Sequence, residues 1–250
     1  MDISKIKQRL TTLQATSSNR DNFWKPPSGK TQIRIVPYKF NKENPFVELY
    51  FHYNLGNNKT FLSPVSFGRP DPVNEFSEKL KSSGNREEWL QGRKIEPKMR
   101  TFAPVVVRGQ EKDGVKFWGF GKTVYQELLG FIADPDYGDI ADAINGRDIV
   151  VERQTPAEAG NQYGKTTIRV KPNQTPITED SKLLEDIFNS QVDLTGIYNE
   201  PSYDELKEAL ENYLNPSDEV DESKPISNNE NKGDSSTKNI EDAFDKLFND

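Results

Sequence analysis

The chain has 250 residues, of which 33% are hydrophobic and 29% charged, with one histidine and no cysteine. The missing cysteines exclude disulfides and thiolate metal sites, and a single histidine argues against His-cluster metal sites and Ser-His or Cys-His catalysis. Residues 1–171 hold 27 Lys and Arg against 20 Asp and Glu (+7), and residues 172–250 hold 6 against 20 (−14), which gives the net charge of −7. This split favours a basic body that binds a polyanion and an acidic end that competes for the same surface.

The beginning of the chain has no apolar signal region, and no apolar run of about 18 residues occurs, so we expect a soluble, cytoplasmic protein. Residues 1–19 predict an amphipathic helix. Its apolar stripe is Ile3, Ile6, Leu10 and Leu13, and Lys5, Lys7 and Arg9 lie off that stripe. Such a helix either packs on its own domain or docks on a neighbouring subunit as a self-association arm.

Residues 20–215 predict a mainly β core with inserted helices. The expected strands, rich in alternating, β-branched and aromatic residues, are 31–36, 46–53, 59–62, 101–108, 115–120, 147–154 and 163–171. Helical spacing predicts short helices at 73–80, 124–132 and 140–144. This order favours an OB-fold-like barrel with a helical insertion, and a plain β-sandwich is the main competitor.

The C-terminal part predicts two acidic flanking helices, at 183–188 and 203–214, and then an acidic, disordered tail over 216–250. The tail ends in an amphipathic pattern in which Ile240, Ala243, Phe244, Leu247 and Phe248 share one face. Such a segment is typical of a ligand for a partner's groove, with Ile240, Phe244, Leu247 and Phe248 as partner-binding residues. The alternative is that it packs back on its own domain.

No set of residues predicts an enzyme. The chain has neither a GxxxxGK[ST] loop nor a GxGxxG that opens a helix. Its carboxylates cluster in the acidic helices and the tail, where a solvated face explains them. A nuclease using carboxylates and Mg²⁺ remains a minor alternative, and we expect no cofactor and no metal.

Nucleic-acid binding is better supported, because basic and aromatic residues are interleaved. Six cations fall within 25 residues: Lys98, Arg100, Arg108, Lys112, Lys116 and Lys122. Four rings lie among them: Phe102, Phe117, Trp118 and Phe120. Cations follow phosphates and exposed rings stack on unpaired bases, so the pattern favours single strands. Alternatively, the rings fill a β core. Period-2 alternation places Arg34 on the face opposite Ile33 and Ile35, which makes it a candidate for the binding face.

These segments together resemble the single-stranded DNA-binding, helix-destabilising proteins of T-even-type bacteriophages over roughly residues 20–215. The resemblance rests on Phe23-Trp24-Lys25, Ile33-Arg34-Ile35-Val36-Pro37, Pro45-Phe46-Val47 leading to His52, Lys98-Met99-Arg100-Thr101, and Phe120-Gly121-Lys122 entering a helix at Val124-Tyr125. The terminal Leu247-Phe248-Asn249-Asp250 is similar to the family's partner-recruiting tail.

The resemblance implies an oligonucleotide-binding fold and a DNA cleft. The residues expected to line it are Arg34, Lys98, Arg100, Lys116, Trp118, Lys122, Arg169 and Lys171, with Tyr50, Phe102 and Tyr163 as further stacking candidates. It also implies cooperative self-association through the N-terminal basic motif, which is present only loosely as Lys5, Lys7 and Arg9.

One departure from the family concerns its structural zinc, which one histidine and three cysteines hold. Here His52 matches the histidine, while Asp71 and Asn74 stand where two cysteines would be and the third falls near Ser63-Pro64. We therefore expect no zinc, and a subdomain held by apolar packing of Phe61, Phe67, Val73 and Phe76.

The sequence thus predicts a protein that coats single-stranded DNA without sequence preference in phage DNA replication, recombination and repair. Its acidic tail would shield the cleft in the free protein and recruit replication proteins when DNA displaces it. The alternative is a protein–protein adaptor of a replication complex whose DNA contact is incidental.

Overall fold

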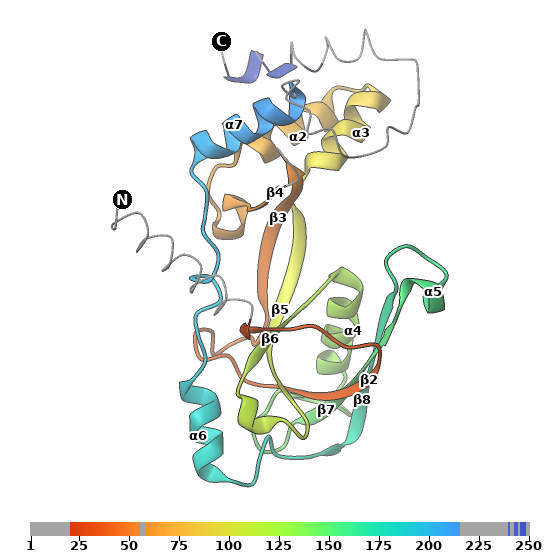
Figure 1. The fold of residues 1–250 in the computed structure, drawn as a ribbon, viewed down its shortest axis with the longest axis vertical. Helices are drawn as coiled ribbons and strands as arrows, with labels where there is room; N and C mark the ends of the chain where they lie inside the picture. Colours follow the sequence, from red (N-terminus) through yellow and green to blue (C-terminus); the bar gives the residue numbers. More distant parts are fainter. Residues whose placement is uncertain (1–20, 56–58, 216–239, 241–242, 245, 249–250) are drawn as a thin grey trace, which may run out of the picture. The chain divides into compact units, whose positions relative to one another are not determined.

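The computed structural model describes residues 21–55, 59–215, 240, 243–244 and 246–248 (Figure 1). The chain divides into two compact units. Unit 1 contains residues up to 48 and 100–198, and unit 2 contains residues 49–99 and those from 199 onward. The segment that the sequence predicts as one core, 20–215, therefore contributes to both units. The expected N-terminal helix over 1–19 and the tail segment 216–239 lie outside the described residues.

The strands of the described chain form one mixed eight-stranded sheet with the order β1-β6-β5-β2-β7-β8, and β3 branches from β5 and pairs with β4. Their bounds are β1 Phe23–Trp24, β2 Gly29–Ile35, β3 Val47–Leu55, β4 Lys59–Leu62, β5 Lys98–Val107, β6 Lys116–Phe120, β7 Arg147–Gln154 and β8 Lys165–Gln174. The pairing of β1 with β6 is parallel. The expected mainly β fold with inserted helices is confirmed.

The core of unit 1 follows from period-2 alternation in its central strands. In β2, Ile33 and Ile35 are fully buried, and Ile33 pairs with Ile149 of β7, which is also fully buried. Helix α4 (Lys122–Ala133) contacts β8 and buries Leu128. Helix α6 (Ser181–Asn189) places Ile187 in a buried apolar cluster. The cluster also contains Val36, the residue after β2, and Val106 of β5.

The helix expected at 140–144 is wrong. The chain makes turns there, because the carboxylate of Asp139 accepts from the backbone N–H of Ala141 and that of Asp142 accepts from those of Ile144 and Asn145. These local bonds offer the backbone an alternative to the helix. Ile140 is buried while Ile144 is 64% exposed, so the two isoleucines do not form one apolar stripe.

Unit 2 is built from β3, β4, the 3-10 turn η1 (Pro64–Phe67) and the helices α2 (Pro72–Ser82), α3 (Arg86–Ile95) and α7 (Tyr203–Leu214). Each helix begins at a polar cap: Asp71 for α2, Asn85 for α3, and a Ser202–Glu205 capping box for α7. Two helices are not predicted from the sequence, namely α3 and the short α5 (Pro156–Ala159) of unit 1.

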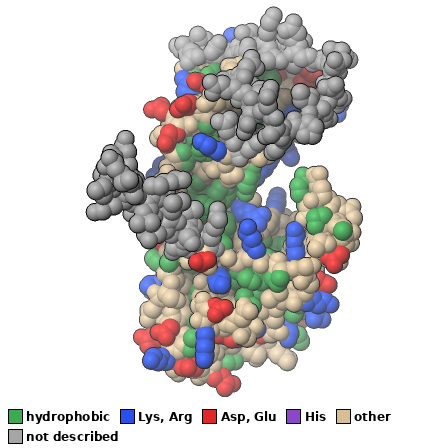
Figure 2. All heavy atoms as spheres, in the orientation of Figure 1, with side chains coloured by type: hydrophobic (Ala, Val, Ile, Leu, Met, Phe, Trp, Pro, Cys, Tyr) green, Lys and Arg blue, Asp and Glu red, His purple; other side chains and the backbone are tan. Residues whose placement is uncertain are grey.

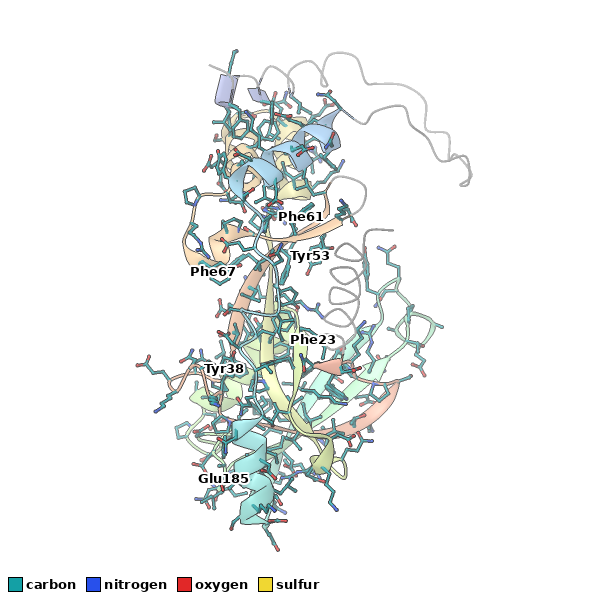
Figure 3. All side chains as sticks on the ribbon, turned by 60° about the vertical axis from the view of Figure 1, so that its left-hand side comes forward. Phe23, Tyr38, Tyr53, Phe61, Phe67 and Glu185 are labelled. Carbon is teal, nitrogen blue, oxygen red and sulfur yellow. The ribbon has the colours of Figure 1, made fainter. Side chains whose placement is uncertain are left out.

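The core of unit 2 is an apolar cluster shared by α2, α3, α7 and β3. Its buried members are Leu55, Val73, Phe76, Leu80, Ile95, Leu206, Ala209, Leu210 and Phe244. Phe61 packs against it from β4, on the side of the hairpin that faces the helices (Figure 3). Phe67 instead has the guanidinium of Arg69 over its ring, with Cζ of Arg69 4.8 Å from the ring centre. None of the described helices is long and apolar enough to cross a membrane.

Candidate nucleic-acid interface

Arg34 is a buried structural residue, and the expectation that it lines a DNA cleft is corrected. Its side chain is completely inaccessible, and Nη1 lies 3.3 Å from Oδ1 of Asp148. Nη2 donates to the carbonyl oxygens of Asp142 and Thr175. Alternation does place Arg34 opposite Ile33 and Ile35, but residues 142–148 and 175–177 cover that face.

The pocket around Arg34 is fitted to a buried guanidinium. Burial lowers the pKa of Arg34 to about 10, although the neighbouring Asp148 works in the opposite direction, so the side chain is still charged at neutral pH. Arg108 shares the same carboxylate, at 2.7 Å from Nη2 to Oδ1. A Cβ at Gly146 would lie 2.8 Å from Nη2 of Arg34, so only glycine leaves room for the approach.

Two of the expected stacking rings are also buried, so these expectations are corrected as well. Trp118 is 1% exposed and packs against Phe120 at a centroid distance of 4.6 Å. Phe102 is 5% exposed, beside Phe23 at 5.9 Å. Both rings fill the β core, which is the alternative that the sequence left open. The half-buried Trp24 packs edge-on against Trp118 at 5.9 Å.

A first group of accessible cations lies where β1 and β6 end and β5 begins, and we call it the strand-end group: Lys25, Arg100 and Lys122. Trp24 pairs with Trp118 in the parallel ladder, so Lys25 comes next to Gly119. Arg100 donates from Nη2 to the carbonyl oxygen of Gly119 at 2.8 Å. Lys122 begins α4 directly beyond β6. All three cations are exposed.

Tyr125 lies in the first turn of α4, close to the strand-end group. Its hydroxyl donates to Oε1 of Glu48 at 2.8 Å, and its ring contacts Phe46 at 5.2 Å. Burial, reinforced by Glu48, raises the pKa of Tyr125 to about 12, so the phenol stays protonated and keeps this bond. The contact anchors the first turn of α4 and thereby the position of Lys122.

A second group lies on the β7–β8 hairpin, and we call it the hairpin group: Arg153, Tyr163, Lys165, Arg169 and Lys171. Lys165, Arg169 and Lys171 share one face of β8, because every second residue of a strand points to the same side. Tyr163 is 75% exposed, and Arg153 donates to its carbonyl oxygen at 2.8 Å. Figure 2 shows Lys and Arg side chains next to this projecting hairpin. Because α4 contacts β8, the helix that begins at Lys122 adjoins the strand that carries this group.

Several accessible cations differ from Arg34 in having no side-chain partner among the described residues. The structure gives the side chains of Lys116, Lys122, Arg169 and Lys171 neither a hydrogen bond nor an ion pair with any residue it describes. A solvated cation of this kind is able to meet a phosphate without first breaking a salt bridge.

Two further expected residues, Lys98 and Tyr50, belong to unit 2. Lys98 precedes Arg100 of the strand-end group by two residues on β5. Lys98 donates to the carbonyl oxygen of Arg93 at 2.9 Å and to Oε1 of Glu96 at 2.6 Å. Tyr50 is half-buried in β3. Lys116 is in unit 1, half-buried on β6 opposite Val105.

The positions expected to replace a zinc site form a buried hydrogen-bonded network in unit 2. Nε2 of His52 lies 2.9 Å from Oδ2 of Asp71, Nδ1 lies 2.8 Å from the carbonyl oxygen of Ile95, and the hydroxyl of Ser63 donates to Asp71. Burial works to raise the pKa of Asp71, but the bonds from His52, Ser63 and the N–H of Asn74 outweigh it and lower that pKa. The network ties β3 to α2 and to the end of α3.

The residues of this network do not fit a zinc ion. Both ring nitrogens of His52 already have partners, and Asp71 is engaged by Ser63 and by the first N–H groups of α2. Within the described ranges no group of three or more His, Asp or Glu is placed to hold a metal. Hydrogen bonds and the apolar cluster therefore join these elements, with Val73 and Phe76 buried as expected.

Arg153 and Lys165 are not among the site residues expected from the sequence, and Lys25 is expected only as part of a family motif. The signal was present in the Gly- and Asn-rich loop between two strands, which basic residues flank at both ends. Lys25 becomes significant only through the β1–β6 register, which no local pattern shows.

Unit 1 thus carries accessible cations beside exposed or half-exposed rings, a combination that proteins binding single-stranded nucleic acid use. A family model described as gp32 DNA-binding protein like matches residues 27–215. The chain therefore belongs to the family of gp32-type single-stranded DNA-binding proteins, which confirms the resemblance seen in the sequence. A search of curated proteins finds no significant match.

Proposed function

We propose that this protein coats single-stranded DNA without sequence preference during phage DNA replication, recombination and repair, in the cytoplasm of the host cell. The observation that carries the proposal is the combination of accessible cations and accessible rings on unit 1. The strand-end group lies beside Trp24, and the hairpin group contains Tyr163. Phosphates would follow the cations while bases stack on the rings, and neither contact reads a base edge.

The proposal includes no chemical step. Family membership supports DNA binding and not catalysis. Cooperative binding through Lys5, Lys7 and Arg9, and recruitment of replication proteins by the C-terminal tail, remain parts of the proposal that rest on the sequence.

The test is a titration of a labelled, unstructured oligothymidylate at several salt concentrations. Lys122→Glu and Arg169→Glu should each weaken binding and reduce the slope of log K against log salt by about 0.7 for each phosphate that is no longer neutralised. Lys182→Glu is the matched control, because Lys182 is an exposed lysine of α6 in the same unit. An affinity that is weak and independent of salt in the unmodified chain would overturn the proposal and favour the adaptor.

A further inference from the structure

The last described residues of the chain lie on the helices of unit 2. Phe244 is 7% exposed and belongs to the apolar cluster of that unit. Its ring meets Phe76 of α2 edge-on at 5.7 Å and Phe248 at 4.8 Å. Ile240, Ala243 and Phe248 pack against the same cluster. The apolar stripe that the sequence assigns to a partner is therefore seated on the chain's own α2 and α7.

Two lysines fix this segment by polar contacts. Lys79 of α2 donates from Nζ to the carbonyl oxygen of Ala243 at 2.9 Å. Lys207 of α7 donates to the carbonyl oxygen of Phe248 at 3.4 Å and lies 5.3 Å from the centre of its ring. These two cations also match the acidic sequence of the segment, which contains Glu241, Asp242, Asp245 and Asp250.

The segment has an outer face that stays available. Leu247 is 36% exposed and Lys246 is exposed, whereas Phe244 is buried. A partner that grips the amphipathic stripe needs Phe244, so the same ring cannot serve α2 and a partner at once. Docking on unit 2 and capture by a partner are therefore mutually exclusive.

We propose that the surface formed by Phe76, Lys79, Lys207 and Leu210 is an intramolecular receptor for the chain's own residues 240–248, which withholds Phe244 from partner proteins. This inference goes beyond DNA binding, since the receptor lies wholly within unit 2. The 24 residues 216–239 join Asn215 to the segment. A linker of that length gives an effective concentration in the millimolar range, so a partner must bind tightly or be locally concentrated to capture the segment.

The chain contains no cysteine, so Lys246→Cys gives a unique thiol for a fluorophore on the exposed face of the segment. In full-length protein without DNA, we expect high anisotropy that does not change on dilution. Phe244→Ala or Lys79→Glu in this background should lower the anisotropy and speed carboxypeptidase removal of the last residues, by roughly tenfold or more for Phe244→Ala. Lys94→Glu, an exposed lysine of α3 in the same unit, is the matched control and should change neither readout.

Three outcomes would overturn the proposal. The first is an anisotropy of the labelled Lys246→Cys protein that is as low as that of the same protein with Phe244→Ala, because the segment would then not be docked. The second is anisotropy that falls on dilution, which assigns the receptor to the segment of a second copy. The third is an equal effect of Lys94→Glu and Lys79→Glu. The effect of Lys79→Glu would then come from the change in net charge and not from the loss of a specific bond to Ala243. None of these readouts involves DNA, so a failure of the proposed function leaves the test intact.

Discussion

At the residue scale, the pair Arg34 and Asp148 shows how a residue that fits a functional pattern can serve the fold instead. Both side chains are nearly inaccessible, and the carboxylate also receives Arg108. A buried charge needs a partner, because its desolvation is otherwise uncompensated. The electrostatic role of Arg34 is thus to join β2 to β7 and to the turn at Asp142.

Asp148→Ala should lower the free energy of unfolding by about 3–5 kcal/mol, because it leaves the guanidinium of Arg34 buried without its counter-charge. Urea denaturation followed by circular dichroism measures the change. Asp113→Ala, which removes an exposed carboxylate from the same unit, is the control and should change stability by less than about 0.5 kcal/mol. Equal stability of the two variants would contradict the structural role of Asp148.

The free energy of unfolding should depend on pH through the ionisation of Asp71. Its pKa is lowered in the folded state by His52, Ser63 and the N–H of Asn74, which prevail over burial. A carboxyl group with a depressed pKa contributes stability that is fully present above its unfolded value, about pH 3.9, and is lost as the pH falls through the folded value. The charged and titratable neighbours are His52 and, from α7, Tyr203.

We therefore expect the free energy of unfolding to fall below about pH 4 more steeply in the unmodified chain than in Asp71→Asn. Asparagine is nearly isosteric and can still cap α2, so the comparison isolates the charge. Urea titrations at a series of pH values measure both slopes. Parallel curves would show that Asp71 does not carry the acid sensitivity.

At the scale of elements, the β7–β8 hairpin is the part of unit 1 that is best placed to meet a base. Its turn contains Gly164 at φ +73°, where a Cβ would lie 2.4 Å from the carbonyl oxygen of Gln154. Glycine therefore permits the tight return into β8. The turn holds Tyr163 outward, with three basic residues following on one face of β8.

Tyr163→Ala should weaken binding of single-stranded DNA by about 1–3 kcal/mol, the range for removal of one base-stacking ring. It should leave thermal stability nearly unchanged, because the ring is 75% exposed. Phe40→Ala removes another exposed ring from unit 1 and serves as the control in the same titration of labelled oligothymidylate. A decrease in affinity that is equal in both variants would argue against a specific role for the hairpin.

At the scale of the whole molecule, the chain joins a β-sheet unit with the candidate DNA-contacting groups to a helical unit that receives its own C-terminal segment. The two share the strands β3 and β5. In the helical unit, a hydrogen-bonded network stands at the positions that the family resemblance assigns to a metal.

Metal removal should therefore have no effect on this protein. We expect excess chelator to leave the melting temperature and the DNA affinity unchanged, because His52 and Asp71 are satisfied by protein groups and the chain has no cysteine. Differential scanning calorimetry before and after chelation, with elemental analysis of the purified protein, provides the measurement. A stoichiometric zinc ion whose removal lowers the melting temperature would refute this expectation.

The sequence by itself determined the strands, most helices, the charge division and the family, because hydrophobic period, caps and short motifs are local properties. It missed α3, whose exposed Trp89 and Leu90 blur the apolar stripe, and it placed a helix at 140–144 where Asp139 and Asp142 make turns.

Only the tertiary structure decided which members of the basic and aromatic set are accessible. The same alternation fits a binding face and a covered face, and Thr175, distant in sequence, accepts a hydrogen bond from the buried Arg34. The register of β1 on β6 brings Lys25 toward Arg100, and a cluster assembled from α2 and α7 receives Phe244. Burial depends on what the rest of the chain places over a residue, and a local pattern does not contain that information.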